Sequence, residues 1–205
     1  MHDYQVLEKG KPLKEAGKAL ILLHGRGSSA NNIIGLADEF ADDNFYIAAP
    51  RATNNTWYPN SFLTPVAQNE PWLSSALQLV KQLIDETAEV LGTENIFVMG
   101  FSQGACLTLE VTSRYPAKYA GIVAFSGGLI GDTVNPVKYK GNLAKTKVFI
   151  GNSDIDPHVP EKRSSESAEV MKNLGADVMC KVYPQMAHTV IYEEIETVRS
   201  AVFSK

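Results

Sequence analysis

Ser102 is the residue whose surroundings most strongly predict chemistry. It lies in the G-x-S-x-G motif of Gly100–Gly104, directly after the apolar run Ile96–Met99 and directly before a helical pattern. In a strand-turn-helix context, the serine occupies a strained turn that lifts its hydroxyl above the edge of a sheet. The following helix directs free N–H groups toward the same point. The motif therefore predicts a catalytic nucleophile in preference to an ordinary serine–glycine turn.

A serine hydroxyl is a weak nucleophile unless a base accepts its proton, and the chain has four histidines to choose from. His2 lies in an N-terminal segment that we expect to fray. His24 directly follows a strand-like run and is expected to shape the next turn. His188 follows the strand-like run Val178–Tyr183, and open α/β sheets place their chemistry in such loops. His188 is therefore the favoured base, with His158 as the second choice.

The base needs a carboxylate that fixes its tautomer. The apolar run Lys147–Gly151 leads into a loop that contains both Asp154 and Asp156. Pro157 holds Asp156 in an extended conformation, but spacing alone does not choose between the two aspartates. The chain order Ser102, Asp, His188 is that of the α/β-hydrolase fold.

Acyl transfer also needs hydrogen-bond donors for the oxyanion that develops in the transition state. One predicted donor is the backbone N–H of Gln103, the residue after the nucleophile. The second is the backbone N–H of Arg26, because the glycines of the loop His24–Ser29 allow amides to point into a site.

Strand and helix patterns alternate along the whole chain, which predicts a mostly parallel sheet with helices on both faces. We expect one α/β-hydrolase domain over residues 1–205, without a separate cap domain. The expected strands lie near Tyr4–Leu7, Ala19–Leu23, Phe45–Ala49, Ile96–Met99, Gly121–Phe125, Val148–Ile150 and Val178–Tyr183. The expected helices cover Asn31–Ala41, the stretch from Pro71 to Leu91, Gln103–Arg114, Pro160–Leu174 and His188–Phe203.

Composition excludes several functional classes. The net charge of −4 and the absence of a basic run predict no nucleic-acid partner. No apolar stretch reaches the roughly twenty residues that span a bilayer, and no signal peptide is recognisable, so we expect no integral membrane association and a cytoplasmic location. Cys106 and Cys180 are expected to be small buried residues, and no metal or cofactor is predicted.

Several strings of this sequence resemble the small carboxylesterase/phospholipase family of α/β hydrolases, which includes bacterial carboxylesterases and acyl-protein thioesterases. The strings are Leu22–Gly27, Ala49–Arg51, Thr56–Tyr58, Gly100–Ala105, Asp156–Pro160 and Met186–His188. The resemblance covers nearly the whole chain. It implies that Asp156 is the acid, and it implies Arg26 and Gln103 as the backbone donors.

Two positions depart from the family pattern. Many members carry an apolar residue at the position of Arg26, and the eukaryotic thioesterases carry an acidic residue at the position of Pro59. An arginine leaves a backbone N–H role intact but argues against a purely apolar acyl site. Its side chain either pairs with a substrate carboxylate or is solvated, and we favour the solvated arrangement.

The segment from Arg51 to Pro71 is the longest stretch without clear periodicity, and such loops are often functional. Trp57 and Tyr58 either line the acyl pocket or pin this loop to the core. Only the family resemblance favours a pocket role for Trp57. We therefore expect both residues in the substrate pocket.

Together these residues predict a serine hydrolase that cleaves carboxylic esters through an acyl-enzyme on Ser102. Its partner would be a small-molecule ester or thioester, and lysophospholipids are chemically allowed. The alternative is a non-catalytic ligand-binding protein on a hydrolase fold. Such proteins usually lose a member of the triad, whereas Ser102, Asp156 and His188 are all present here.

Overall fold

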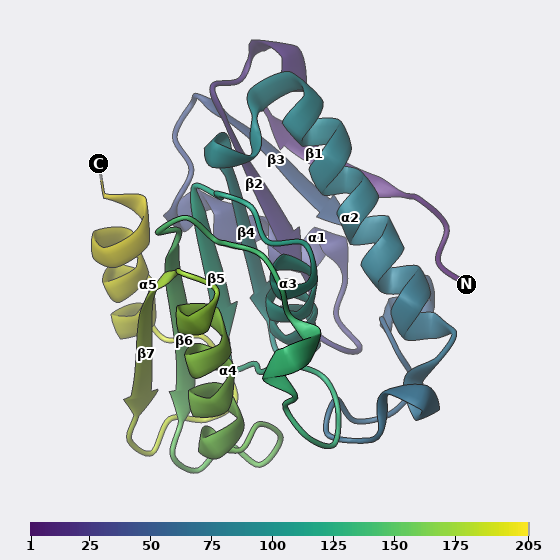
Figure 1. Cartoon of the computed structure of the whole chain (residues 1–205). Coiled ribbons are helices and arrows are strands. Elements are labelled where there is room, and N and C mark those ends of the chain that lie inside the picture. Colours follow the sequence, from purple (N-terminus) through teal and green to yellow (C-terminus); the bar gives the residue numbers. More distant parts are fainter. Residues whose placement is uncertain (205) are drawn as a thin grey trace.

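A seven-stranded sheet forms the centre of the molecule (Figure 1), and the computed structural model describes residues 1–204. The strands lie in the order β1-β3-β2-β4-β5-β6-β7, with β1 antiparallel to β3 and all other pairs parallel. They are β1 (Val6–Gly10), β2 (Lys18–Leu23), β3 (Phe45–Pro50), β4 (Ile96–Phe101), β5 (Gly121–Phe125), β6 (Lys147–Ser153) and β7 (Asp177–Tyr183).

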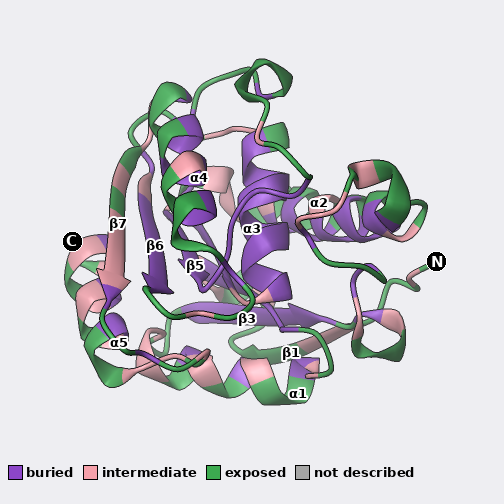
Figure 2. Ribbon diagram, turned by 90° about the horizontal axis from the view of Figure 1, so that it is seen from below, coloured by how far each residue is buried: buried purple, intermediate pink, exposed green. Residues whose placement is uncertain are grey.

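Helices cover both faces of the sheet, as Figure 2 shows from below. One face carries the three longest helices, α2 (Trp72–Leu91), α3 (Gln103–Arg114) and α4 (Glu161–Asn173). The other face carries the short helices α1 (Ala30–Ile33) and α5 (Tyr192–Val198). This is the α/β-hydrolase arrangement that the alternating sequence predicts.

Two apolar cores follow from this layering, because a central parallel strand is buried on both faces. In β2, Ala19, Ile21 and Leu23 face the core beneath α2 and α3, whereas Leu20 and Leu22 face the core on the side of α1 and α5. All five are fully buried. The period of two in this strand therefore divides its side chains between two cores.

Most predicted elements differ by a residue or more in their bounds, and the first strand and two helices show how. The first strand begins at Val6 and not at Tyr4, because its register against β3 pairs Val6 with Pro50. The helix expected over Asn31–Ala41 is the single turn of α1 followed by a 3₁₀ segment, Ile34–Glu39. The last helix begins at Tyr192 and ends in a π-helical turn.

The turn between β4 and α3 depends on two glycines. A Cβ atom at Gly104 would lie 2.0 Å from the carbonyl oxygen of Leu23, and one at Gly100 would lie 2.4 Å from the carbonyl carbon of Gly104. Backbone atoms cannot move aside as a flexible side chain can. Only glycine therefore lets α3 press against β2 and β4 at this point.

Replacing Gly104 by alanine tests this close packing. We expect Gly104→Ala to lower the free energy of unfolding by about 3 kcal/mol or more, because backbone must move to admit the methyl group. Gly35→Ala is the matched control, since nothing lies within 4 Å of a Cβ there, and it should change stability by less than about 1 kcal/mol. Urea unfolding measures both, and equal effects would contradict the packing argument.

Glu194 is a fully buried acid in the first turn of α5. Its Oε2 accepts a hydrogen bond from the N–H of Ile191 at 3.2 Å, which caps the helix, while its Oε1 has no hydrogen-bond partner. Burial raises the pKa of Glu194 to about 7. The folded state therefore holds a proton that the unfolded chain releases near pH 4.5.

This raised pKa makes stability depend on pH. Between about pH 4.5 and 7 the folded state binds more protons, so stability falls as the pH rises. We expect Glu194→Gln to be more stable than the wild type at about pH 8, by up to about 3 kcal/mol, and to lose that advantage below about pH 4.5. Urea unfolding across this range is the measurement, and Glu193→Gln is the exposed control. A pH-independent difference would refute the titration of Glu194.

Candidate active site

Ser102 lies at the junction of β4 and α3 with φ 54° and ψ −118°, a conformation that non-glycine residues rarely adopt. Its N–H donates to the carbonyl of Phe125 at 2.9 Å, which ties the turn to the next strand of the sheet. The two close-packed glycines on either side hold the strained conformation in place. The predicted strained turn is therefore present at Ser102.

A continuous chain of hydrogen bonds leads away from the serine hydroxyl. The Oγ of Ser102 lies 2.9 Å from Nε2 of His188, and Nδ1 of His188 lies 2.7 Å from Oδ2 of Asp156. His188 comes from the loop between β7 and α5, and Asp156 from the loop between β6 and α4. The ring of Phe101 packs beside the imidazole, with 5.1 Å between ring centroids.

The structure separates the two aspartates that spacing left unresolved. Asp156 has a fully buried side chain, and its Oδ1 accepts from the N–H groups of His158 and Val159 at 2.8 and 3.0 Å. Burial alone would raise the pKa of Asp156, but the hydrogen bonds from His188 and from those two amides outweigh it and lower the pKa. Asp154 instead accepts from the N–H of Gln185, and the hydrogen bond of His188 goes to Asp156.

The other three histidines have different surroundings. His24 is buried, its Nδ1 bonds to the Gly25 carbonyl, and its Nε2 accepts from the Ala52 N–H, so it shapes its turn as predicted. The expected fraying at His2 is wrong, because its ring nitrogens bond to the backbone of Trp57 and Thr53. His158 lies beside His188, with 4.8 Å between ring centroids, and makes no hydrogen bond to Ser102.

Two backbone amides near Ser102 are available to a ligand. Within residues 1–204, the N–H groups of Arg26 and Gln103 donate to no other protein group. Gln103 begins α3 directly after the serine. Gly25 places the Arg26 loop nearby, since a Cβ there would lie 3.4 Å from the Cβ of Ser102. Free amides beside a serine hydroxyl are suited to stabilise a negatively charged oxygen.

A cavity of about 510 Å³ opens at this serine. It is lined by Arg26, Tyr58, Pro59, Asn60, Ser61, Phe62, Ser102, Gln103, Cys106, His158, Val159 and His188. Residues 58–62 form one wall, here called the 58–62 wall. Sequence reasoning missed most of this wall, because only its two aromatic residues, Tyr58 and Phe62, differ in type from an ordinary polar loop.

Trp57 does not line the cavity, so the pocket role predicted for it is wrong. It is fully buried, its Nε1 donates to the carbonyl of His24, and its ring packs on the His24 ring at 4.9 Å between centroids. Its side chain pins the loop to the core. Tyr58, the neighbouring residue, does lie on the cavity wall.

The side chain of Gln103 connects the serine turn to this wall. Its Oε1 accepts from the N–H of Trp57, and its Nε2 donates to the carbonyl of Tyr58, both at 2.9 Å. The amide side chain is buried, so both bonds are protected from competing water. The sequence assigned only the backbone of Gln103 to the site, since nothing in the string indicates where its amide points.

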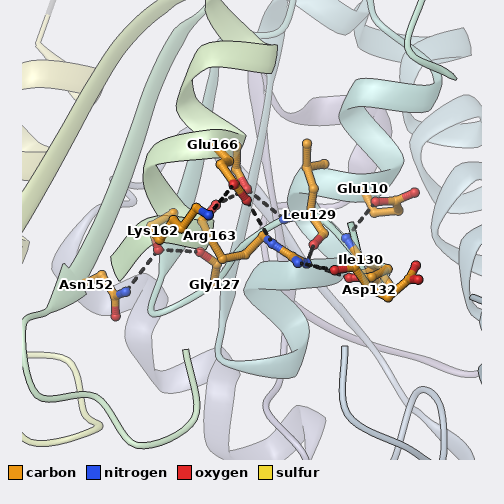
Figure 3. A network of polar contacts seen from close by, with 12 residues as sticks. Glu110, Gly127, Leu129, Ile130, Asp132, Asn152, Lys162, Arg163 and Glu166 are labelled. Carbon is orange, nitrogen blue, oxygen red and sulfur yellow. Dashed lines mark hydrogen bonds and ion pairs between the residues drawn. The ribbon is translucent and has the colours of Figure 1, made fainter. Parts of the chain in front are cut away.

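Two buried acidic and basic side chains, Glu110 and Arg163, hold the segment of residues 129–132 (Figure 3). Glu110 on α3 accepts from the N–H of Ile130, and Arg163 on α4 donates to the carbonyls of Leu129, Gly131 and Asp132. The N–H of Gly131 in turn donates to the carbonyl of Phe62 at 2.8 Å. Segment 129–132 is therefore held by side chains of α3 and α4 and is hydrogen-bonded to the 58–62 wall.

The Arg26 side chain is exposed but is not simply solvated, contrary to the favoured expectation. Its Nη1 donates to the carbonyl of Pro59 at 2.8 Å and its Nη2 to that of Asn60 at 2.6 Å. The guanidinium therefore fastens the loop of residues 24–29 to the 58–62 wall. Sequence alone gives no sign of these contacts, because their acceptors are backbone atoms about 33 residues away.

Neither a metal cluster nor a membrane-spanning helix is found in the described part of the chain. Within residues 1–204, no group of three His, Cys, Asp or Glu side chains could hold a metal ion. No helix in the same range is long and apolar enough to cross a bilayer. Cys106 is buried one helical turn after Ser102 and lines the cavity, while Cys180 is partly buried in β7.

Two acyl-protein thioesterases resemble part of this chain. Acyl-protein thioesterase 1 of Gibberella zeae is 34% identical over 127 residues, 60% of this chain and 52% of that protein. The thioesterase of the same name from Saccharomyces cerevisiae is 34% identical over 137 residues, 63% of this chain and 57% of that protein. The matches therefore span little more than half the length of these two relatives.

A solved structure matches over nearly the full length. The crystal structure of a phospholipase/carboxylesterase from Dyadobacter fermentans is 46% identical, with a TM-score of 0.96 over 99% of this chain and 98% of that one. The sequence model of the phospholipase/carboxylesterase family matches residues 3–203. With the fold and the serine turn described above, these matches place the chain in the phospholipase/carboxylesterase family of α/β hydrolases.

Proposed function

We propose that the protein hydrolyses carboxylic esters, with Ser102 as nucleophile, His188 as general base and acid, and Asp156 as the orienting carboxylate. The observation that carries this proposal is the unbroken hydrogen-bonded chain from the Ser102 hydroxyl to the Asp156 carboxylate. It has the connectivity that activates a serine in unrelated hydrolases. The family membership supports the same activity.

In the first half of the reaction, the Oγ of Ser102 attacks the acyl carbon while its proton passes to Nε2 of His188. Nδ1–H of His188 donates to Asp156, which holds the ring in the tautomer that leaves Nε2 free to accept. The tetrahedral intermediate collapses as His188 returns the proton to the leaving alcohol. The acyl group is then bonded to Ser102.

In the second half, water attacks the acyl carbon, its proton passes to His188, and the acid departs as Ser102 regains its hydrogen. The backbone N–H groups of Arg26 and Gln103 hold the oxyanion in both intermediates. Each such donor lowers the barrier by about 3 kcal/mol in enzymes that use this device. Because both amides lack a protein acceptor, they need not break a bond to bind the oxyanion.

The proposed substrate is a small-molecule ester, and the same machinery accepts a thioester. Residues of the 58–62 wall, including Tyr58, would contact the substrate. A single domain over residues 1–205 and a cytoplasmic location stay predictions of the sequence. The alternative, a non-catalytic binding protein, is disfavoured because the three side chains are present and hydrogen-bonded in order.

Removal of the nucleophile gives the first test. We expect Ser102→Ala to lower kcat for p-nitrophenyl acetate and butyrate by about 10⁴-fold or more, because no acyl-enzyme forms. Ser126→Ala is the matched control, since Ser126 also directly follows a strand and has positive φ, but its buried Oγ has no partner. It should change kcat by less than about tenfold. Equal activity of the two variants would exclude Ser102 as the nucleophile.

The two aspartates of the loop after β6 give the second test. We expect Asp156→Asn to lower kcat/KM by about 10⁴-fold, because an amide in place of the carboxylate favours the wrong tautomer of His188. Asp154→Asn removes a negative charge but keeps a side-chain oxygen that can accept from the Gln185 N–H, so it should cost less than about tenfold. Steady-state hydrolysis of the same esters compares them, and the reverse ranking would assign the acid to Asp154.

A further inference from the structure

The guanidinium of Arg26 is fixed in position and has no counter-charge. Two backbone carbonyls hold it, and its Cζ lies 5.9 Å from the centre of the Tyr58 ring. No carboxylate pairs with it among residues 1–204, although ten other ion pairs form there. A fixed guanidinium has already lost most of the side-chain entropy that a ligand contact would otherwise cost.

The cavity next to this arginine has an unbalanced charge. Its lining includes the charged Arg26 and neutral polar side chains such as Asn60 and Ser61, and it includes no aspartate or glutamate. The nearest acid in the mechanism, Asp156, lies behind His188 with its carboxylate engaged in three hydrogen bonds. The cavity therefore presents positive and neutral donors to a substrate.

We propose that the substrate carries a carboxylate in addition to its ester, and that the Arg26 side chain binds this carboxylate. A guanidinium has five N–H donors, of which two bond to Pro59 and Asn60, so three are available for a carboxylate. Planar carboxylates match this donor geometry. The substrate class is thus a half-ester of a dicarboxylic acid, or a hydroxy acid that is acylated on its hydroxyl group and keeps its carboxylate. This inference rests on the proposed ester hydrolysis.

Matched ester pairs test the preference and identify which half of the substrate carries the charge. Monoethyl glutarate and ethyl pentanoate have five-carbon acyl groups with and without the carboxylate, and 3-acetoxypropanoate and propyl acetate vary the alcohol side instead. We expect wild-type kcat/KM to be at least about tenfold higher for the charged member of one pair, measured by acid release at about pH 8. If kcat/KM for the charged ester is equal to or below that for the neutral ester in both pairs, the proposal is overturned.

Variants of Arg26 separate charge recognition from support of the wall. Arg26→Gln should lower the charged-to-neutral ratio by about tenfold, while Arg26→Lys, which keeps the charge, should retain most of it. Both variants keep the backbone N–H. A loosened 58–62 wall would lower kcat/KM for the charged and the neutral ester together, without changing their ratio. A ratio unchanged in Arg26→Gln would overturn the proposal.

Ionic strength provides a readout that a purely structural arginine would not move. Raising the salt from about 0.05 to about 0.5 M should lower the wild-type ratio and leave that of Arg26→Gln nearly constant. Salt-independent ratios in the wild type would argue against recognition by charge. Turnover of the neutral esters tests ester hydrolysis itself, so a failure of that function is distinguishable from a failure of this inference.

Discussion

The close approach of α3 to β2 and β4 is the constraint on which the site depends. There is no space for a side chain at position 100 or 104. Because glycine has none, Gly100 and Gly104 let the chain turn sharply enough to hold Ser102 at positive φ. That turn sets the serine hydroxyl, the Gln103 amide and the start of α3 in one geometry. The cost of a strained residue, about 1–3 kcal/mol, is offset by the packing of the buried helix that follows.

The remaining parts of the site are held by polar side chains bonded to backbone. Gln103 joins the serine turn to the loop of Trp57 and Tyr58, and Arg26 joins the loop of residues 24–29 to Pro59 and Asn60. Arg163 fixes segment 129–132, which in turn bonds to Phe62. Because no regular element forms the 58–62 wall, these contacts replace the ladder hydrogen bonds that would otherwise define its shape.

Local sequence patterns predict the strands, the helices and the nucleophile well, and they predict the walls of the site poorly. Buried strands and the helix from Trp72 to Leu91 have clear periodicities, and Ser102 has a motif tied to its element context, so both are predictable. The choice of Asp156 over Asp154 needed the family resemblance, since both lie in one loop. Trp57 was misassigned because an aromatic residue in a loop suits a pocket and a core equally, and only tertiary contacts decide.

The most direct test of the account is covalent labelling by an active-site phosphonate, followed by peptide mass spectrometry. A phosphonate mimics the tetrahedral intermediate and reacts much faster with a serine that is activated beside oxyanion donors than with an ordinary serine. The account predicts one adduct per chain, located on the peptide that contains Ser102 and absent from His188→Ala. A folded protein that is not labelled, or is labelled on another serine, would contradict the central claim.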